Sequence, residues 1–581
     1  MIRAEGRGLK AEGPIQEVAR VKRFVILSLL AFVSACTTQS AAPPASFDVV
    51  LQGGTVYDGT GVPPRKADVG LRGDRVAQVG DLARAEAKTR VDVTGLAIAP
   101  GFINVLSWAN ESLIADGRSQ SDLRQGVTLE IFGEGWSMGP LNAAMKKEAL
   151  EQQGDLKFDI PWTSLGQYLD HLVARGVSPN VASFVGATTV RIHELGYADR
   201  APTPAELARM QELVRAAMRE GALGVGSSLI YAPASFSKTG ELIALARAAA
   251  ESGGAYISHI RSEGQRFLEA LDELIAITRA AGVHGEAYHL KAAGKANWPK
   301  MREAIARIEQ ARAEGLDLSA DMYAYTAGAT GLDAAMPPWV QEGGLDQWVT
   351  RLKDPKMRQR VAREMRSGGP DWESLYLAAG SPDAVLLLGF RNDALKPLTG
   401  MTLAQVAKQR GTSPEEAAMD LVVEDHSRVT TAYFLMSEDN VKLGLSQPWV
   451  ALGSDAEAPA PEGVFLKSNV HPRAYGNFAR FLGKYVREER VATLPDAIRR
   501  LTSLPARNFK LKDRGCLAAG CYADVAVFDP GAIADHATFE APHRLATGVS
   551  HVLVNGVPVL RDGEHTGARP GRLVRGPGWR P

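Results

Sequence analysis

Two histidines lie about thirty residues apart, each at the end of a short apolar segment. His259 follows Ala255 to Ser258, His289 follows Gly285 to Tyr288, and the run from Gln265 to Gly282 between them is amphipathic like a helix. This order predicts a βαβ unit, with both imidazoles at the C-terminal ends of neighbouring parallel strands. Two neutral imidazoles there provide half of a zinc or iron site. The alternative is two unrelated histidines that only form hydrogen bonds.

The composition indicates a large globular protein. The chain has 581 residues, 45% of them hydrophobic and 23% charged, with 66 basic and 66 acidic side chains. This length is sufficient for a large core and more than one domain. The balanced charge gives no sign of nucleic-acid binding, and we expect none.

The N-terminal region has the pattern of an export signal. A basic stretch, Arg20 to Arg23, precedes an apolar run, Phe24 to Ala35, that is too short to span a bilayer and suits a signal-peptide core. The run ends in Val33-Ser-Ala-Cys36, which resembles a bacterial lipobox and predicts a lipid anchor at Cys36. Thr37 follows, as in lipoproteins sent to the outer membrane, so we expect a periplasmic, lipid-anchored protein. A secretory signal with an unmodified cysteine is the alternative.

The other two cysteines, Cys516 and Cys521, flank a plausible turn, Leu-Ala-Ala-Gly. In an oxidising compartment they could form a disulfide across a hairpin, and two free thiols are equally compatible with the spacing. No histidine lies at ligand spacing nearby, so we do not expect a metal site there.

Strand-like segments at both ends of the chain predict one small β-domain. After a signal and tether over residues 1–46, Phe47 to Asp58 has the pattern of two strands around a Gly-Gly turn. Similar strands return at Ala523 to Asp529 and at Val549 to Leu560, where Asn555-Gly556 is a hairpin signal. We therefore expect residues 47–100 and 506–581 to form a β-sandwich together.

Between these ends, over residues 101–505, strand-like and helix-like patterns alternate. Thr128 to Phe132 and Ala222 to Ile230 resemble strands, and Pro204 to Glu220 and Thr239 to Ser252 resemble helices. The alternation predicts an α/β fold, a parallel (β/α)8 TIM-like barrel. From about 343 to 447 the pattern is irregularly helical and more charged, which we interpret as an insertion and a candidate lid over the barrel mouth.

A set of short motifs runs along the chain. They are Val91-Asp-Val-Thr-Gly-Leu-Ala-Ile-Ala-Pro-Gly-Phe-Ile-Asn104, Gly221-Ala-Leu-Gly-Val-Gly-Ser-Ser-Leu-Ile-Tyr231-Ala-Pro233, Ser258-His259-Ile-Arg261-Ser-Glu263-Gly264, His289-Leu-Lys291, Asp321-Met-Tyr323-Ala-Tyr325, Gly453-Ser-Asp455 and His471-Pro-Arg473. The first resembles the amidohydrolase superfamily, and the set resembles its N-acyl-D-amino-acid deacylases, or D-aminoacylases. The resemblance extends from Phe47 to about Gly571. It implies metal-dependent hydrolysis of the amide of a small N-acyl amino acid.

Two departures from the family pattern concern the metal ligands. Where the superfamily has His-x-His on the first strand, this chain has Leu106-Ser-Trp108, which removes half of a two-metal site. Where D-aminoacylases have a cysteine ligand in Gly-Asn-Cys-Gly, this chain has Gly135, preceded by Glu134. We expect about one zinc ion per chain, bound by Glu134 and the two histidines, since His2Glu is a known catalytic zinc set.

Two alternatives concern this third ligand. Glu134 has a structural or substrate-binding role instead, or Glu130 replaces it, although Glu130 lies further back along the strand.

The resemblance also implies the residues that would act on the substrate. Asp455 is in the position of the general acid/base, although an aspartate there is also a common helix N-cap. Arg473 and Lys291 would bind the α-carboxylate, the arginine through a two-pronged contact and the lysine as a point charge. Three tyrosines are expected along the same rim: Tyr231, Tyr323 and Tyr325.

Two other functions are compatible with this sequence. One is an amidohydrolase that acts on a cyclic amide or a dipeptide, which would keep His259, His289 and Asp455. The other is a lipid-anchored binding protein on a metal-free barrel, because two expected ligands are missing.

Overall fold

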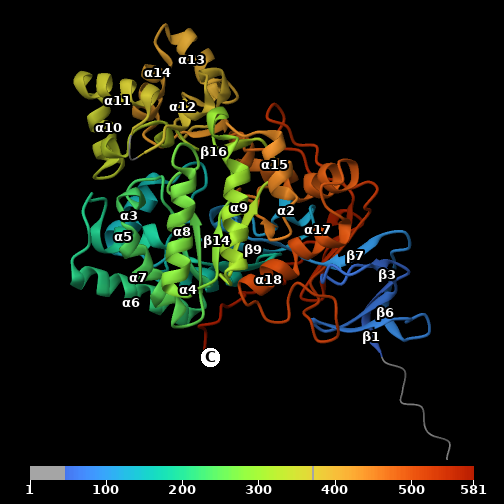
Figure 1. Cartoon of the computed structure of the whole chain (residues 1–581). Helices are drawn as coiled ribbons and strands as arrows, with labels where there is room; N and C mark the ends of the chain where they lie inside the picture. The colour runs from blue at the N-terminus through green and yellow to red at the C-terminus, as the bar shows by residue number, and fades with distance from the viewer. Residues whose placement is uncertain (1–45, 370–371, 581) are drawn as a thin grey trace, which may run out of the picture. The chain divides into compact units, whose positions relative to one another are not determined.

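The computed structural model describes residues 46–369 and 372–580 (Figure 1). The predicted signal segment and Cys36 lie outside the described residues. Within them, no helix combines the length and the apolar character needed to cross a membrane.

The small β-domain is built from both ends of the described chain. In one sheet, β1 (Phe47–Gln52) lies between β4 (Asp68–Arg72) and β6 (Ala87–Asp92). In the other, β7 (Ala97–Pro100) pairs antiparallel with β20 (Val525–Phe528). Side chains of both sheets share one apolar core, which includes Leu51 and Val69 from the first sheet and Ile98, Val525 and Leu553 from the second. The two sheets therefore pack face to face as a sandwich.

The two cysteines near β20 are joined. Cys516 and Cys521 form a disulfide, with their Cα atoms 6.1 Å apart, so the free-thiol alternative does not describe this structure. Leu517, between them, packs into the core of the sandwich.

A parallel ring of strands forms the barrel. Within the described chain it has eight strand positions, since β10 and β11 are two halves of one strand interrupted at Phe184. The ring closes where Val105 N–H donates to Leu452 O at 3.3 Å and Ser107 pairs in parallel with Ala456. In order, the strands are β8 (Phe102–Asn104), β9 (Val127–Phe132), β10 (Asn180–Ser183) with β11 (Val185–Gly186), β12 (Gly224–Ser228), β13 (Ala255–His259), β14 (Gly285–Ala287), β15 (Leu318–Met322) and β19 (Val450–Leu452).

Helices between the strands cover the ring. α6 (Pro204–Glu220), α7 (Thr239–Ala250), α8 (Phe267–Ala281) and α9 (Lys300–Ala313) pack side by side (Figure 1). α6 begins where the Thr203 side chain accepts from Glu206 N–H while the Glu206 side chain accepts from Thr203 N–H. It ends at Gly221, whose φ of 109° suits glycine. These capping signals at both ends explain why the helix α6 could be predicted from the sequence.

The insertion interrupts the barrel between β15 and β19. It contains a separate antiparallel sheet of β16 (Ala327–Gly331), β18 (Thr430–Phe434) and β17 (Val385–Gly389). Four of its helices are α10 (Leu345–Leu352), α11 (Pro355–Ser367), α13 (Leu403–Arg410) and α14 (Pro414–Asp425).

The departure from the barrel begins at β16, earlier than the boundary near 343 that the charge pattern indicated. β16 consists of Ala-Gly-Ala-Thr-Gly, which lacks the alternating apolar pattern of a recognisable strand. The insertion also ends before residue 447, because α15 (Glu438–Leu445) packs against the barrel helix α9.

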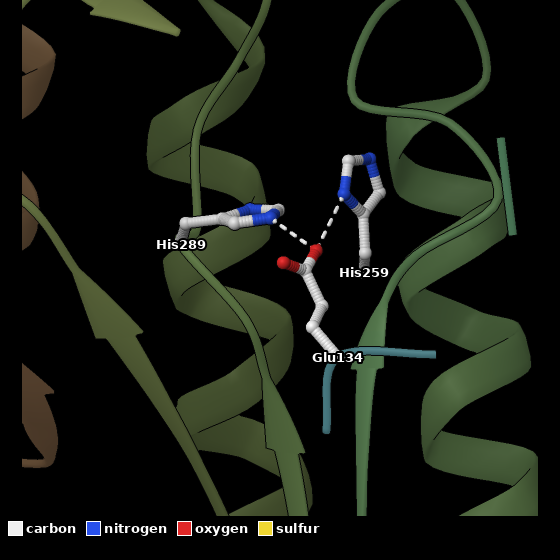
Figure 2. A group of neighbouring side chains, drawn as sticks. All are labelled: Glu134, His259 and His289. Atoms are coloured by element: carbon white, nitrogen blue, oxygen red, sulfur yellow. Dashed lines mark hydrogen bonds and ion pairs between the residues drawn. The ribbon is translucent and has the colours of Figure 1, made fainter. Parts of the chain in front are cut away.

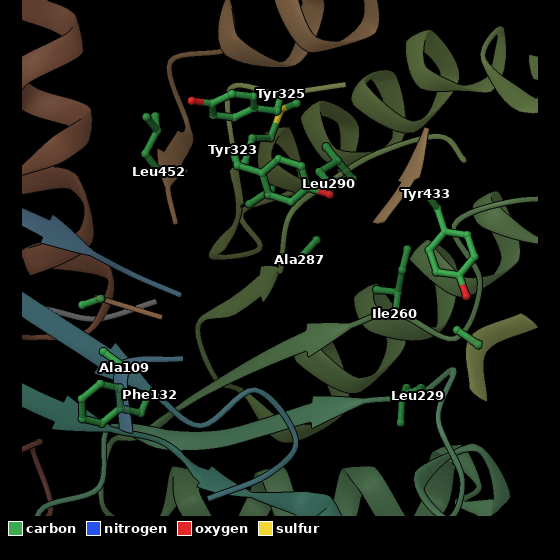
Figure 3. Packing of buried hydrophobic residues seen from close by; sticks show 14 of the residues in the cluster. Ala109, Phe132, Leu229, Ile260, Ala287, Leu290, Tyr323, Tyr325, Tyr433 and Leu452 are labelled. Carbon is green, nitrogen blue, oxygen red and sulfur yellow. The ribbon is translucent and has the colours of Figure 1, made fainter. Parts of the chain in front are cut away.

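Apolar side chains fix the ends of the barrel strands. Leu229, Ile260 and Leu290 follow β12, β13 and β14, and each is at most 3% exposed. Figure 3 shows them in the buried cluster that surrounds this part of the barrel. Because neighbouring residues of an extended chain point in opposite directions, burying Ile260 in the packing directs His259 the other way. His289 lies in a turn just after β14, with a φ of +36°, and its backbone N–H donates to Asp321 Oδ1 at 3.0 Å, which fixes its position.

Candidate active site and metal centre

Three side chains from three barrel strands meet at the rim. Glu134 Oε1 lies 3.0 Å from His259 Nδ1 and 2.9 Å from His289 Nε2 (Figure 2). All three residues are buried. The structure thus brings together Glu134, His259 and His289, the residues expected to bind metal.

This metal group, Glu134, His259 and His289, fits a divalent transition metal. Its two imidazole nitrogens and one carboxylate oxygen lie within 4.8 Å of one another. Ligands at about 2.0–2.2 Å from a tetrahedral zinc ion are about 3.3 Å apart, close to the separations seen here. Three protein ligands leave a fourth position for water or substrate, as in catalytic rather than structural zinc sites.

A second carboxylate, which the sequence analysis did not single out, lies behind His289. Glu263 Oε1 is 3.0 Å from His289 Nδ1 and 3.8 Å from His259 Nε2, and it forms a 2.5 Å ion pair with Lys291 Nζ. A carboxylate on the remote nitrogen of a ligating histidine fixes the tautomer and orientation of the ring. The Ser-His-Ile-Arg-Ser-Glu motif contained the signal, since Glu263 lies only four residues after His259.

The charges in this cluster affect one another. Burial and the Lys291 ammonium oppose protonation of His289, but Glu134 and Glu263 outweigh them and raise the pKa of His289 to about 10. Burial likewise opposes the charge on Glu134, yet the two imidazoles hold the pKa of Glu134 below its ordinary value. Since a metal binds neutral imidazole, a metal ion and a proton compete for His289.

The loop that carries Glu134 excludes a side chain at the next position. Gly135 has a φ of +71°, and a Cβ there would lie 2.8 Å from Ser228 Cβ. Ser228 Oγ donates to Glu134 O, and Thr188 N–H donates to Gly135 O, both at 2.9 Å. Position 135 therefore does not accept a cysteine in this conformation, and Glu134 is the residue that reaches the histidines.

Asp455 lies beside the metal group and is held from two sides. Its Oδ1 accepts from Trp108 Nε1 at 3.1 Å, and its Oδ2 lies 2.9 Å from Arg473 Nη2. Its backbone has a φ of +49°, an unusual conformation for a non-glycine residue. Burial raises the pKa of Asp455, although Arg473 opposes the shift. A carboxyl group that is only 11% exposed and has a raised pKa suits proton transfer better than an exposed helix cap would.

Arg473 is buried and keeps unused donors. Within the described chain, its Nε and Nη1 have no hydrogen-bond partner. Its guanidinium lies 4.4 Å from the ring centre of Tyr323, whose hydroxyl is also buried without a partner among the described residues. These donors lie next to Asp455, where a substrate carboxylate would complete their hydrogen bonding.

The other predicted substrate residues have different positions. Tyr231 packs edge-on against His259, with ring centres 5.3 Å apart. Lys291 is at the site, but it is engaged by Glu263 and lies 2.7 Å from His289 Nδ1.

The Tyr325 hydroxyl donates to Asp535 Oδ2 at 3.3 Å, and its ring packs edge-on against His471, with ring centres 5.4 Å apart. Arg480, 4.8 Å from the Tyr325 ring, also pairs with Asp535, so Tyr325 lies between this ion pair and His471, and its contact with substrate stays a prediction.

Glu130 does not join the metal group. Its Oε1 accepts from Ser119 Oγ at 2.9 Å, and its Oε2 accepts from Asn104 Nδ2 at 3.2 Å. Asn104 also donates to Asp122 at 3.0 Å, and burial raises the pKa of both Glu130 and Asp122. The alternative in which Glu130 replaces Glu134 as a ligand is therefore not supported.

The segment Gly135-Trp-Ser137-Met-Gly139 matches the Gly-x-Ser-x-Gly pattern of serine hydrolases. Ser137 Oγ donates to Gly139 O at 2.6 Å and accepts from Gly186 N–H at 2.9 Å. Both contacts are to backbone, so this hydroxyl is a structural element of the loop and has no histidine base among the partners that the structure describes.

The insertion touches the loops that carry the site. Arg428 lies 5.0 Å from the ring centre of Tyr231 and pairs with Asp333 at 2.9 Å. Glu373 accepts from the N–H groups of Glu263 and Gly264, each at 2.8 Å. The insertion thus supports the site from outside the barrel, and its action as a lid stays a prediction.

Comparison with known proteins gives a consistent result. A family model described as "Amidohydrolase family" matches residues 130–560, a range that begins after Leu106 and Trp108. D-aminoacylase of Alcaligenes xylosoxydans xylosoxydans is 34% identical over 541 residues, covering 92% of this chain and 99% of the relative. N-acyl-D-glutamate deacylase of the same organism is 32% identical over 533 residues, covering 91% and 96%.

Solved structures are similar over the same range. N-acyl-D-glutamate deacylase from Bordetella bronchiseptica, complexed with zinc and a phosphonate mimic of the tetrahedral intermediate, has a TM-score of 0.75 at 30% identity, covering 91% of this chain and all of that one. D-aminoacylase has the same TM-score at 33% identity and the same coverage. The match in sequence, the match in structure and the buried metal group agree: the chain belongs to the amidohydrolase family, alongside the D-aminoacylases, and is a metal-dependent hydrolase.

Proposed function

We propose that this protein hydrolyses the amide bond of N-acyl-D-amino acids, with one zinc ion held by His259, His289 and Glu134. The observation that carries this proposal is Arg473, a buried arginine beside Asp455 with two donors that have no partner among the described residues. A buried cation with free donors next to an acid/base group is what an anionic acyl amino acid requires. The relatives named as deacylases of N-acyl-D-amino acids support the same substrate class.

In the proposed reaction, Asp455 accepts a proton from the attacking water and passes it to the nitrogen of the leaving amine. When bound, zinc polarises the substrate carbonyl and lowers the pKa of a water molecule to about 7. Arg473 binds the α-carboxylate through one of those two donors, Nε or Nη1, together with Nη2 on the same edge of the guanidinium, while Nη2 also contacts Asp455. The products are a carboxylic acid and a free amino acid.

A substrate panel tests the proposal directly. The soluble form that begins just after Cys36, loaded with one equivalent of zinc, is assayed with N-acetyl-D-amino acids, their L enantiomers, dipeptides and cyclic amides. We expect hydrolysis of the N-acetyl-D compounds. Turnover of cyclic amides or dipeptides alone would show that the protein is a different amidohydrolase, and no turnover with zinc bound would favour a binding protein.

Replacing Arg473 with lysine should chiefly weaken substrate binding. Lysine keeps the charge but cannot form the two-pronged contact, so we expect KM to rise about 10- to 100-fold. Steady-state kinetics with the best N-acetyl-D-amino acid measures this. Arg480→Lys is the matched control, because Arg480 is paired with Asp535 outside the site. An unchanged KM in Arg473→Lys would remove Arg473 from the carboxylate site.

We also propose that Cys36 carries a lipid that anchors the protein in the periplasm, at the outer membrane. The lipobox-like sequence and the following threonine support this. Membrane fractionation of cells that express the full chain tests it. The wild-type protein should be found with outer membranes and label with radioactive palmitate, whereas Cys36→Ser should do neither; equal labelling of both forms would contradict the anchor.

A further inference from the structure

One indole N–H joins two parts of the site. Trp108 Nε1 lies 3.1 Å from Glu134 Oε2 and 3.1 Å from Asp455 Oδ1. Glu134 belongs to the metal group through its other oxygen, and Asp455 is the proposed acid/base. A single neutral donor thus lies between two carboxylates with different tasks.

The backbone fixes this indole relative to Asp455. Trp108 N–H donates to Ala456 O at 2.9 Å, and Asp455 N–H donates to Leu106 O at 2.8 Å. On the other side, Ser107 N–H donates to Ile131 O at 2.9 Å, which ties the segment to the strand that precedes Glu134. Trp108 therefore cannot move without moving the turn that carries Asp455.

The two carboxylates, Glu134 and Asp455, need a cation or a hydrogen-bond donor between them. Glu134 Oε2 and Asp455 Oδ1 each lie 3.1 Å from the same nitrogen, and carboxylate oxygens that converge on one point are the ligands that a divalent cation binds. Asp455 also has a left-handed backbone conformation, which persists only when surrounding contacts hold it. Trp108 supplies a hydrogen bond to each oxygen, and its ring fills the space beside them.

We infer that Trp108 takes the place of a second metal ion: it positions Asp455 for proton transfer and keeps the site to one ion. This inference deepens the proposed function and its kinetic part rests on it. Trp108 is a positioning residue, because it acts through Asp455 and Glu134 rather than on the substrate.

The first test counts metal ions and needs no activity. Wild-type protein and Trp108→His are dialysed against excess zinc, and bound zinc per chain is measured by elemental analysis. The histidine adds a ligand beside Glu134 and Asp455 and removes the bulk of the indole. We expect about one ion in the wild type and about two in the variant. Two ions in the wild type, or no additional ion in Trp108→His, would overturn the inference.

The second test separates positioning from general structure. Trp108→Phe keeps an aromatic ring and loses only the N–H. We expect bound zinc to stay at the wild-type value, KM to change less than threefold and kcat to fall about tenfold or more. The matched control is Trp339→Phe, which removes another indole–carboxylate hydrogen bond, to Glu364 at 2.8 Å, in the insertion. Its kcat should equal that of the wild type.

The two tests distinguish a failure of the inference about Trp108 from a failure of the proposed deacylase function. If the wild type hydrolyses no N-acyl-D-amino acid, the deacylase proposal fails, while the zinc counts still decide whether Trp108 excludes a second ion. If the wild type is active and Trp108→Phe has wild-type kcat, or loses its zinc together with kcat, Trp108 does not position Asp455.

Discussion

Replacing His259 or His289 with alanine should release the metal and abolish hydrolysis. Each substitution removes one of the three ligands and leaves Glu134 with a single imidazole partner. We expect less than about 0.1 zinc per chain after dialysis and a fall in kcat/KM of about 10³-fold or more, equivalent to about 4 kcal/mol of transition-state stabilisation. Elemental analysis and steady-state kinetics on the same preparation measure both.

A half-buried histidine outside the metal group provides the control for this result. Among the described residues the His193 side chain pairs with Glu194 at 3.0 Å, so His193→Ala should keep both zinc and activity. A His289→Ala protein that retained one tightly bound zinc ion would show that the metal lies elsewhere.

Replacing Asp455 with asparagine should lower kcat strongly without releasing the metal. The amide keeps the shape and the contact with Trp108, but it cannot accept a proton. We expect kcat to fall about 10²- to 10⁴-fold while zinc content stays at the wild-type value and KM changes little. Asp535→Asn, which alters the ion pair with Arg480, is the control and should keep wild-type kcat.

The pH profile adds a qualitative check on the same residue. Burial raises the pKa of Asp455 above 3.8, so the basic form required for proton acceptance is lost as the pH falls through that raised value. Wild-type kcat/KM should therefore decline on the acid side at a higher pH than an ordinary aspartate would give. This limb should be absent from the residual activity of Asp455→Asn, and an identical limb in both proteins would assign it to another group.

The sequence was sufficient to predict the parts of the site that depend on local order. The alternation of strand and helix patterns predicted neighbouring strands for His259 and His289, because a βαβ unit leaves little freedom in where its strand ends lie. Glu134 was identified from its place next to Gly135, and the structure shows that the glycine conformation and Ser228 leave no space for a side chain at position 135, while Glu134 reaches the two histidines.

Contacts between distant segments could not be predicted in this way. Trp108 and Asp455 are 347 positions apart, and their hydrogen bond depends on how the first and last barrel strands meet. Glu263 lies four residues after His259 in the sequence, yet its contact with His289 depends on the loop that Glu373 holds from the insertion. Tyr325 shares a motif with Tyr323, but its contacts with Arg480 and Asp535 could not be predicted, because neither residue lies near it in sequence.

The pairing of β7 with β20 has a consequence for how the chain acquires its structure. Pro100 lies opposite Val525, so one edge of β7 has no partner until almost the whole polypeptide has been synthesised. Contacts between such distant residues form slowly, and an unpaired strand edge invites association with other chains. A nascent or truncated chain that ends before β20 would expose this edge, which makes the C-terminal segment a built-in requirement for completing the fold and avoiding aggregation.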